Sequence, residues 1–140
     1  MTEPRRRVAV AIIEREGKLL IAQRNAGSSF PLFWELPGGR CSKGEDPAAC
    51  VAREVKEETG LIVQPEASAG VFEHPYPEFT VEIHVFFCRI LAGEPRPLES
   101  RKIAWIRWDD IPKYTFPAAN DRIFSEAQRL RALPRLTIDD

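Results

Sequence analysis

The stretch that decides the fold is GGRCSKGEDPAACVAREVKEETGL, residues 38–61. Asp46 and Pro47 are typical of a helix start, because an aspartate can cap free amides and proline needs no N–H in the first turn. Gly60 is the matching stop signal. The apolar positions between these signals recur at helical spacing and form a predicted buried stripe: Cys50, Val51 and Val55. The sequence therefore predicts one helix between Asp46 and Gly60.

The opposite side of this helix is acidic. Glu57 and Glu58 follow Glu54 by three and four positions, so we expect the three glutamates to project from a single face with Cβ atoms ~5–6 Å apart. Their repulsion is unfavourable, and the C-terminal end of a helix dipole also disfavours anions. A solvated face is the simpler interpretation. A hard divalent cation would turn repulsion into attraction, and Mg2+ or Mn2+ suits carboxylate and phosphate oxygens.

Residues beside the acidic face favour a ligand site. Gly38 and Gly39 would let backbone atoms approach a ligand that any Cβ would obstruct, although they could also form a simple turn. Arg53 can pair bidentately with Glu45 and fix the loop to the helix, unless this is only a weak surface ion pair.

The rest of the chain predicts more strands than helices. A hairpin is expected at residues 8–13 and 18–22, and the apolar run 33–36 ends at a turn formed by Pro37, Gly38 and Gly39. A second helix is expected at 118–132. Further strands are predicted at 61–63, 70–74, 79–91 and 103–108. Because strands and helices do not alternate, the pattern indicates an α+β sandwich.

Composition limits the partners and the location. With 20 basic and 21 acidic residues the net charge is -1, so no global field favours a nucleic acid polymer. The three cysteines are an odd number without a CxxC pair, which argues against a disulfide framework or a zinc site and favours a reducing cytoplasm. No segment is typical of a signal peptide or a membrane anchor. We expect one domain over 1–140, with flexible ends at 1–6 and 137–140.

The acidic stretch resembles a known motif. Gly39, Glu45, the run Arg53-Glu54-Val55, the pair Glu57-Glu58 and the pair Gly60-Leu61 stand at the spacing of the Nudix box. The resemblance implies a Nudix fold, in which a mixed β-sheet is sandwiched between α-helices. It also implies Mg2+-dependent hydrolysis of a nucleoside diphosphate linked to another group, with Mn2+ as a substitute ion.

The resemblance to the box implies roles for its residues. Glu54, Glu57 and Glu58 would bind the metal, and the carbonyl of Gly38 or Gly39 would add a ligand. Arg53 and Glu45 would hold the loop and helix in place. Glu54 is the first choice for the general base, and Glu99 is the second.

Beyond the box, the chain resembles the MutT branch, which hydrolyses oxidised dGTP. Residues 8–24 resemble its opening hairpin, and residues 93–112 resemble the segment whose acid, Glu99 here, supplies another metal ligand. Residues 116–121, FPAAND, resemble its purine-reading segment. The amide of Asn120 offers a donor and an acceptor to a guanine edge, although Asn120 could instead cap the last helix.

The resemblance also suggests nucleotide contacts. Arg24 and Arg40 would bind phosphate oxygens, although Arg24 could equally be a surface arginine. Glu78-Phe79 stands where the branch has an Asp-Arg pair, so we count Glu78 as a nucleotide contact in a segment that departs from the pattern. The expected reaction is attack of water on the β-phosphorus of a triphosphate.

Two other functions stay open at this point. The first is a pyrophosphohydrolase for CTP, dCTP or modified pyrimidine nucleotides. The second is a nucleotide-sensing module without catalysis. The expected partner is in each case a small nucleotide, with no nucleic acid polymer and no membrane, for a monomer or a homodimer.

Overall fold

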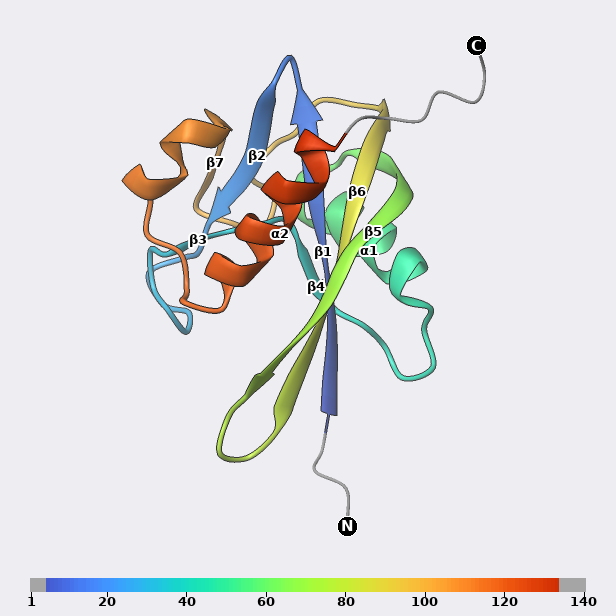
Figure 1. The fold of residues 1–140 in the computed structure, drawn as a ribbon, viewed down its shortest axis with the longest axis vertical. Coiled ribbons are helices and arrows are strands. Elements are labelled where there is room, and N and C mark those ends of the chain that lie inside the picture. Colours follow the sequence, from blue (N-terminus) through green and yellow to red (C-terminus); the bar gives the residue numbers. More distant parts are fainter. Residues whose placement is uncertain (1–4, 134–140) are drawn as a thin grey trace.

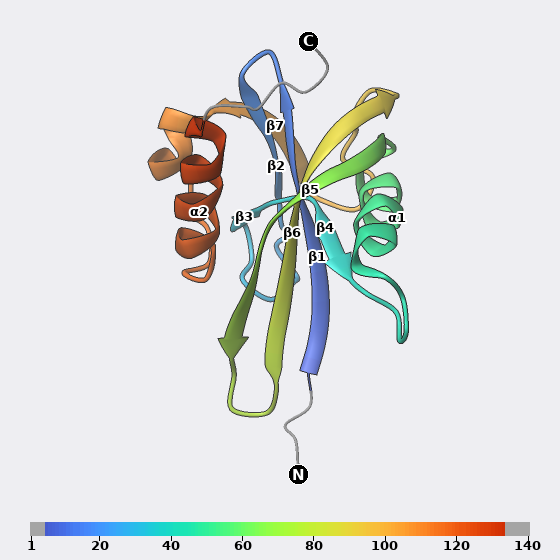
Figure 2. The ribbon, with the colours of Figure 1, turned by 45° about the vertical axis from the view of Figure 1, so that its right-hand side comes forward.

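The computed structural model describes residues 5–133 and shows two helices on opposite sides of a mixed β-sheet (Figures 1 and 2). A 3-10 helix, η1, follows the last strand. The elements in chain order are β1 (Arg5–Arg15), β2 (Lys18–Gln23), β3 (Trp34–Glu35), β4 (Gly38–Arg40), α1 (Pro47–Thr59), β5 (Ile62–Pro75), β6 (Thr80–Ala92), β7 (Lys102–Arg107), η1 (Trp108–Lys113) and α2 (Asn120–Ala132).

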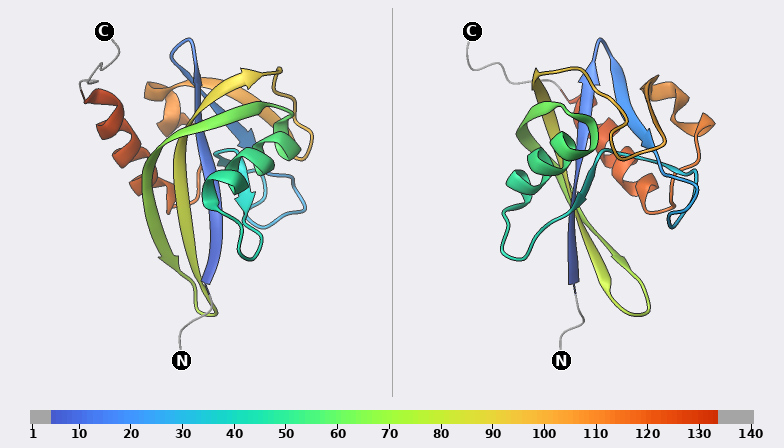
Figure 3. Two further views of the ribbon diagram at one scale, coloured as in Figure 1. Left: turned by 90° about the vertical axis from the view of Figure 1, so that its right-hand side faces the viewer. Right: turned by 180° about the vertical axis from the view of Figure 1, so that it is seen from behind.

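The sheet is organised around β1. Residues 5–13 of β1 pair in parallel with residues 80–88 of β6, and β6 pairs antiparallel with β5. Along its other edge β1 pairs antiparallel with β4 and, through its last residues, with β2. β2 in turn pairs with β3 and β7. Figure 3 shows β1, β6 and β5 curving side by side along the molecule. This arrangement places the short strand β4 directly beside α1.

Each face of the sheet has its own hydrophobic core. On one face α1 contributes Cys50, Val51 and Val55, the three residues predicted as its buried stripe. On the other face α2 contributes Ile123, Phe124 and Ala127. β6 supplies side chains to both cores, because successive side chains of a strand point to opposite faces of the sheet. The predicted sandwich of helices around a mixed sheet is therefore confirmed.

The helix and hairpin signals in the sequence are confirmed in detail. The Asp46 side chain accepts hydrogen bonds from the amides of Ala48 and Ala49, at 3.1 and 3.3 Å. Gly60 ends α1 in the left-handed conformation, at φ 82°. Glu16 and Gly17 close the β1–β2 hairpin, both with positive φ as a tight turn requires.

Two predictions of secondary structure are wrong, because each concerns a segment whose strand pairing is not evident from the local sequence. The predicted strands 61–63 and 70–74 are parts of one strand, β5, interrupted by register shifts near Pro65 and Ser68. Such bulges break the alternation of side chains on which the prediction relied. Similarly, the expected turn at Gly38 and Gly39 is strand β4, paired with residues 8–10 of β1.

Two residues of the predicted N-terminal tail belong to the β-sheet. Arg5 and Arg6 belong to β1, where they pair with Thr80 and Val81 of β6. The Arg6 guanidinium also stacks over the Phe79 ring at 3.8 Å. The assignment of these two arginines to a flexible tail is therefore wrong. Residues 1–4 and the predicted end segment 137–140 lie outside the described residues.

Helix length bears on the expectation of no membrane partner. α1 and α2 each contain 13 residues, whereas a membrane-spanning helix needs ~20 apolar residues. Within residues 5–133, neither helix therefore has the length or the apolar character to cross a bilayer.

Gly38 provides a test of the β1–β4 pairing. A Cβ at this position would lie 2.2 Å from the Ala9 carbonyl oxygen, and its φ of +152° is strained for other residues. We therefore expect Gly38→Ala to lower the free energy of unfolding by about 2 kcal/mol or more, measured by urea denaturation.

Gly27→Ala is the matched control, since a Cβ there meets no heavy atom within 4 Å. Its unfolding free energy should stay within about 0.5 kcal/mol of the parent protein. Equal stability of the two variants would contradict the close β1–β4 approach.

Candidate active site

Glu54 lies directly against the backbone of β4. A Cβ built on Gly39 would be 2.3 Å from Glu54 Oε2 and 2.5 Å from its carboxyl carbon. Real Cβ atoms do not approach so closely, so a larger residue at position 39 would displace the Glu54 carboxylate from this position. The close approach at Gly39 thus involves the Glu54 side chain, whereas the predicted approach of a ligand to Gly38 and Gly39 stays a prediction.

Arg53 joins the β4–α1 loop to the helix. Its Nε donates to Glu45 Oε2 at 2.8 Å and its Nη2 to Glu45 Oε1 at 3.0 Å, which is the bidentate pairing predicted from the sequence. Its Nη1 donates to Glu54 at 3.0 Å and to Glu57 at 3.1 Å. The Arg53 guanidinium and the Ser42 amide lower the pKa of Glu45 to about 2. Glu45 is therefore ionised and held in place.

The burial of Glu58 argues against the simpler interpretation, in which the acidic residues form a solvated face. The residue is 7% exposed, and among the described residues its Oε1 is buried without a hydrogen-bond partner. Burial, together with smaller contributions from repulsion by Glu35, Glu99 and Glu54, raises the pKa of Glu58 to about 8. The side chain of Glu57, in contrast, is 49% exposed. Only part of the acidic set therefore faces solvent.

Four carboxylates form a group that we call the glutamate cluster: Glu35 of β3, Glu54 and Glu58 of α1, and Glu99 of the β6–β7 connection. Burial also raises the pKa of Glu54, with smaller contributions from Glu57 and Glu99. The ordinary way to relieve such repulsion is a bound cation. The cluster therefore has the chemistry of a site for a hard divalent ion.

Glu35 is the cluster member that the sequence analysis missed. Burial raises its pKa, and the Arg24 guanidinium, whose Nη1 is 2.8 Å from Glu35 Oε1, opposes that shift. The available signal was a single carboxylate inside the apolar run Phe33-Trp34-Glu35-Leu36. Burying a carboxylate in an apolar strand costs free energy unless the carboxylate is paired. An acidic residue at such a position therefore suggests a functional role.

The two arginines predicted to bind phosphate lie in different surroundings. Arg24 is already engaged, because it pairs with Glu35 and its Nη2 donates to Ser29 Oγ at 2.8 Å. Arg40 is exposed at the end of β4, immediately after Gly39. Both arginines are thus carried by segments that reach the glutamate cluster.

Asn120 and Glu78 lie outside the glutamate cluster. Asn120 is the first residue of α2, and its Nδ2 donates to the Pro117 carbonyl at 3.2 Å. The N-cap is Ala119, so the alternative in which Asn120 caps the helix is wrong. Glu78 is exposed in the turn between β5 and β6, at the tip of the long hairpin in Figure 1. The structure does not bring Glu78 to the carboxylates.

Hydrogen bonds between loops place Glu99 and the Asn120 segment near β3. Asn25 Nδ2 donates to the Glu99 carbonyl at 2.9 Å, which ties the β6–β7 connection to the loop after β2. The Trp34 amide donates to the Thr115 carbonyl at 2.8 Å, which ties the segment before α2 to β3. β3 therefore connects the glutamate cluster with the segment that carries Asn120.

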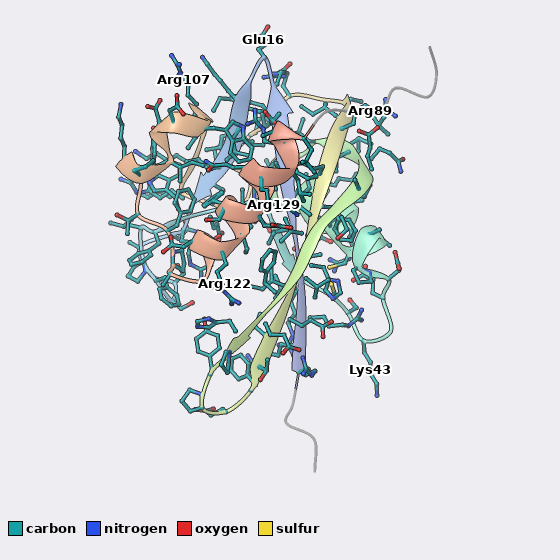
Figure 4. The ribbon with its side chains drawn as sticks, in the orientation of Figure 1. Glu16, Lys43, Arg89, Arg107, Arg122 and Arg129 are labelled. Atoms are coloured by element: carbon teal, nitrogen blue, oxygen red, sulfur yellow. The ribbon has the colours of Figure 1, made fainter. Side chains whose placement is uncertain are left out.

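Two surface hollows lie beside α2 and away from the glutamate cluster. One, of about 560 Å³, is lined by Phe72, Arg122 and Arg129 among others, and Figure 4 shows the two arginines along α2. The other, of about 650 Å³, lies near Glu14 and Arg131. The convergence of carboxylates, and not the size of a hollow, therefore identifies the candidate active site.

Comparison with known proteins assigns the family. The model of the NUDIX domain matches residues 8–126. A Haemophilus influenzae protein named 8-oxo-dGTP diphosphatase is 29% identical, over 83% of this chain and 86% of its own. An Escherichia coli protein named CTP pyrophosphohydrolase is 28% identical, over 89% and 93%.

A solved structure supports the same assignment. The MutT protein from Methanosarcina mazei superposes with a TM-score of 0.83 at 28% identity, and the match covers 95% of this chain and 99% of that one. The similarity thus extends over both cores and all the segments that carry the glutamate cluster. The chain belongs to the Nudix family, as a hydrolase of its MutT-like branch.

Proposed function

We propose that this Nudix hydrolase uses Mg2+ to convert a nucleoside triphosphate into the monophosphate and pyrophosphate, with 8-oxo-dGTP as its substrate. The observation that carries the proposal is the glutamate cluster, in which Glu58 Oε1 is buried without a hydrogen-bond partner among the described residues. The H. influenzae relative named 8-oxo-dGTP diphosphatase supports the choice of substrate.

The residues present fit a hard divalent ion. Glu54, Glu57 and Glu58 supply carboxylate oxygens, Glu99 is close enough to raise the pKa of two of them, and a carbonyl of Gly38 or Gly39 completes the proposed set. All of these donors are oxygen atoms, which Mg2+ prefers, and Mn2+ can replace it. The buried Oε1 of Glu58 has no hydrogen-bond partner among the described residues, so it is free to bind such an ion.

Glu54 is the proposed general base. When bound, the divalent ion neutralises charge on the phosphate oxygens and on the transition state. Burial raises the pKa of Glu54, and a raised pKa makes a carboxylate a better proton acceptor near neutral pH. Arg53, at 3.0 Å, fixes the orientation of this carboxylate. Glu99 is the second candidate for the base.

The proposed reaction is a displacement at the β-phosphorus. Water adds to this phosphorus and gives its proton to the base, and the bond to the oxygen that bridges to the α-phosphorus breaks. The products are pyrophosphate and the nucleoside monophosphate. Arg40, exposed beside Gly39, and Arg24 would bind phosphate oxygens. For Arg24 this requires sharing its guanidinium with Glu35. Glu78 stays a weaker candidate for a nucleotide contact.

Asn120 is the proposed reader of the base. It is half-buried at the start of α2, and its side-chain amide offers one acceptor and two donors. The E. coli relative named CTP pyrophosphohydrolase supports a second candidate substrate, CTP or dCTP, because its identity to this chain is nearly the same. The oligomeric state, monomer or homodimer, and the cytoplasmic location stay predictions.

Replacing the proposed base tests the catalytic assignment. Glu54→Gln keeps the size of the side chain but removes proton transfer, so turnover of the triphosphate should fall by at least about 100-fold. Release of pyrophosphate with and without Mg2+ is the measurement. Glu66→Gln is the control, since Glu66 pairs with Arg89 on an exposed surface. Unchanged turnover in Glu54→Gln would exclude this glutamate as the base.

The raised pKa of Glu58 predicts a pH dependence of stability. In the metal-free protein Glu58 holds its proton up to a pH of about 8, whereas the unfolded chain releases it near 4.5. The free energy of unfolding should therefore fall between about pH 5 and pH 8, because only the folded state still binds the proton there.

Glu58→Gln cannot ionise and should show a shallower decline. Urea denaturation of both proteins at several pH values with a chelator is the measurement. Saturating Mg2+ should stabilise the parent protein more as the pH rises, since the ionised carboxylate is the ligand. Identical slopes for the two proteins would show that Glu58 does not titrate in this range.

Asn120→Ala tests base recognition. The variant should raise the KM for 8-oxo-dGTP by at least about tenfold, because a lost hydrogen-bonding group leaves the base edge unpaired. The kcat should change little. A panel with dGTP, CTP and dCTP shows which base loses affinity. A change confined to the pyrimidine nucleotides would favour the second candidate substrate.

A further inference from the structure

Three potential metal ligands meet on the inner side of the β4–α1 loop. The Sγ atoms of Cys41 and Cys50 and a carboxylate oxygen of Glu45 all lie within 4.8 Å of one another. Cys41 is 9% exposed, Cys50 is fully buried, and neither forms a disulfide. We propose that these three residues, the Cys41–Glu45–Cys50 triad, bind Zn2+ at a site distinct from the glutamate cluster, and that binding there inhibits the enzyme.

The spacing of the three atoms is close to that of a zinc site. Tetrahedral Zn2+ holds sulfur at ~2.3 Å and oxygen at ~2.1 Å, so its ligand atoms lie ~3.3–3.8 Å apart. Atoms that are already within 4.8 Å reach this spacing by moves of about 1 Å. Three protein ligands leave the fourth position for water.

The fold explains why spacing in the sequence does not reveal this site. Cys41 directly follows β4, whereas Cys50 lies in the first turns of α1. The loop between them folds back, and hydrogen bonds from Arg53 and the Ser42 amide hold the Glu45 carboxylate in place. In Figure 4 the Lys43 side chain points outward from this loop, away from the body of the protein.

Ligand type separates this site from the glutamate cluster. The two thiols belong to the core beneath α1, whereas the cluster consists of carboxylates alone. Thiolates select Zn2+, and oxygen ligands favour Mg2+ or Mn2+. When Zn2+ binds, each thiol loses its proton to solvent as a zinc–sulfur bond forms, so two protons are released.

Glu45 couples the two sites. Both of its carboxylate oxygens accept hydrogen bonds from Arg53, at 2.8 and 3.0 Å. A zinc ion that takes one of these oxygens weakens the pairing with Arg53. Arg53 also holds Glu54, the proposed base, at 3.0 Å. Zinc in the triad should therefore slow hydrolysis. This inhibition rests on the proposed function, whereas the binding of Zn2+ to the triad does not.

The first test measures binding without any assay of activity. The full chain is kept reduced, Mg2+ is added to saturation, and Co2+ is titrated as a spectroscopic substitute for Zn2+. A cobalt–thiolate bond gives a charge-transfer absorption that cobalt bound to carboxylates lacks. The parent protein should develop this band. Absence of the band would overturn the proposal, whatever the outcome for hydrolysis.

Cysteine variants assign the ligands. Cys41→Ser and Cys50→Ser should each weaken Co2+ binding by more than about tenfold, since even outer-shell partners of a metal are worth that much. Cys88→Ser is the matched control, because Cys88 is the third buried cysteine and packs in the same core. It should keep the band and the affinity. A band that survives in both Cys41→Ser and Cys50→Ser would overturn the proposal.

Glu45→Gln keeps both thiols, so its affinity for Co2+ tests the site even if the serine variants do not fold. It should keep the charge-transfer band but bind Co2+ more than about tenfold more weakly. An unchanged affinity would exclude Glu45 as a ligand. In the hydrolysis assay, added Zn2+ should inhibit the parent protein and Cys88→Ser alike, while Cys50→Ser should resist it. Equal inhibition of all three would show that Zn2+ acts at the glutamate cluster instead.

Discussion

The hydrogen bonds of Arg53 are the interaction on which the site depends. One guanidinium contacts Glu45 of the loop, the carbonyl of Arg40 in β4, and Glu54 and Glu57 of its own helix. Each exposed ion pair of this kind contributes little alone. Together they set the position of β4 relative to α1, and this position brings the Glu54 carboxylate against Gly39. A lysine could not replace Arg53, because it lacks the planar fork.

The glutamate cluster is held in an unfavourable state by the rest of the fold. Glu58 belongs to the same helix as the residues of the α1 core, so packing of that core buries its carboxylate as well. The neighbouring acids of β3 and the β6–β7 connection then raise its pKa to about 8. Proton and divalent cation compete for the same oxygens. If the cluster binds a divalent cation as proposed, the ion would replace this proton and relieve the repulsion among the buried carboxylates.

Some of this could be predicted from the sequence, because the signals are local. The caps of α1, its buried stripe and the Arg53–Glu45 pair depend on spacing within a few turns. The burial of Glu58 and its electrostatic interaction with Glu35 of β3 depend on the tertiary fold, which brings together residues far apart in the sequence. The bulges of β5 likewise depend on pairing with β6. These features were missed because they depend on contacts between residues far apart in the sequence, which local sequence patterns do not reveal.

Glu45 would link the two proposed metal sites, because it contacts Arg53 and also lies beside two thiols. It accepts hydrogen bonds from Arg53, which also holds Glu54, one of the proposed oxygen ligands of the glutamate cluster. Toward the core it lies beside two thiols that spacing alone had argued against as zinc ligands. A hard ion leaves the thiols untouched, whereas a thiophilic ion must take an oxygen that Arg53 now holds. The Glu45 carboxylate cannot bind a zinc ion and keep both hydrogen bonds from Arg53. The kind of metal ion available would therefore decide whether Arg53 still holds Glu54, the proposed base, in position.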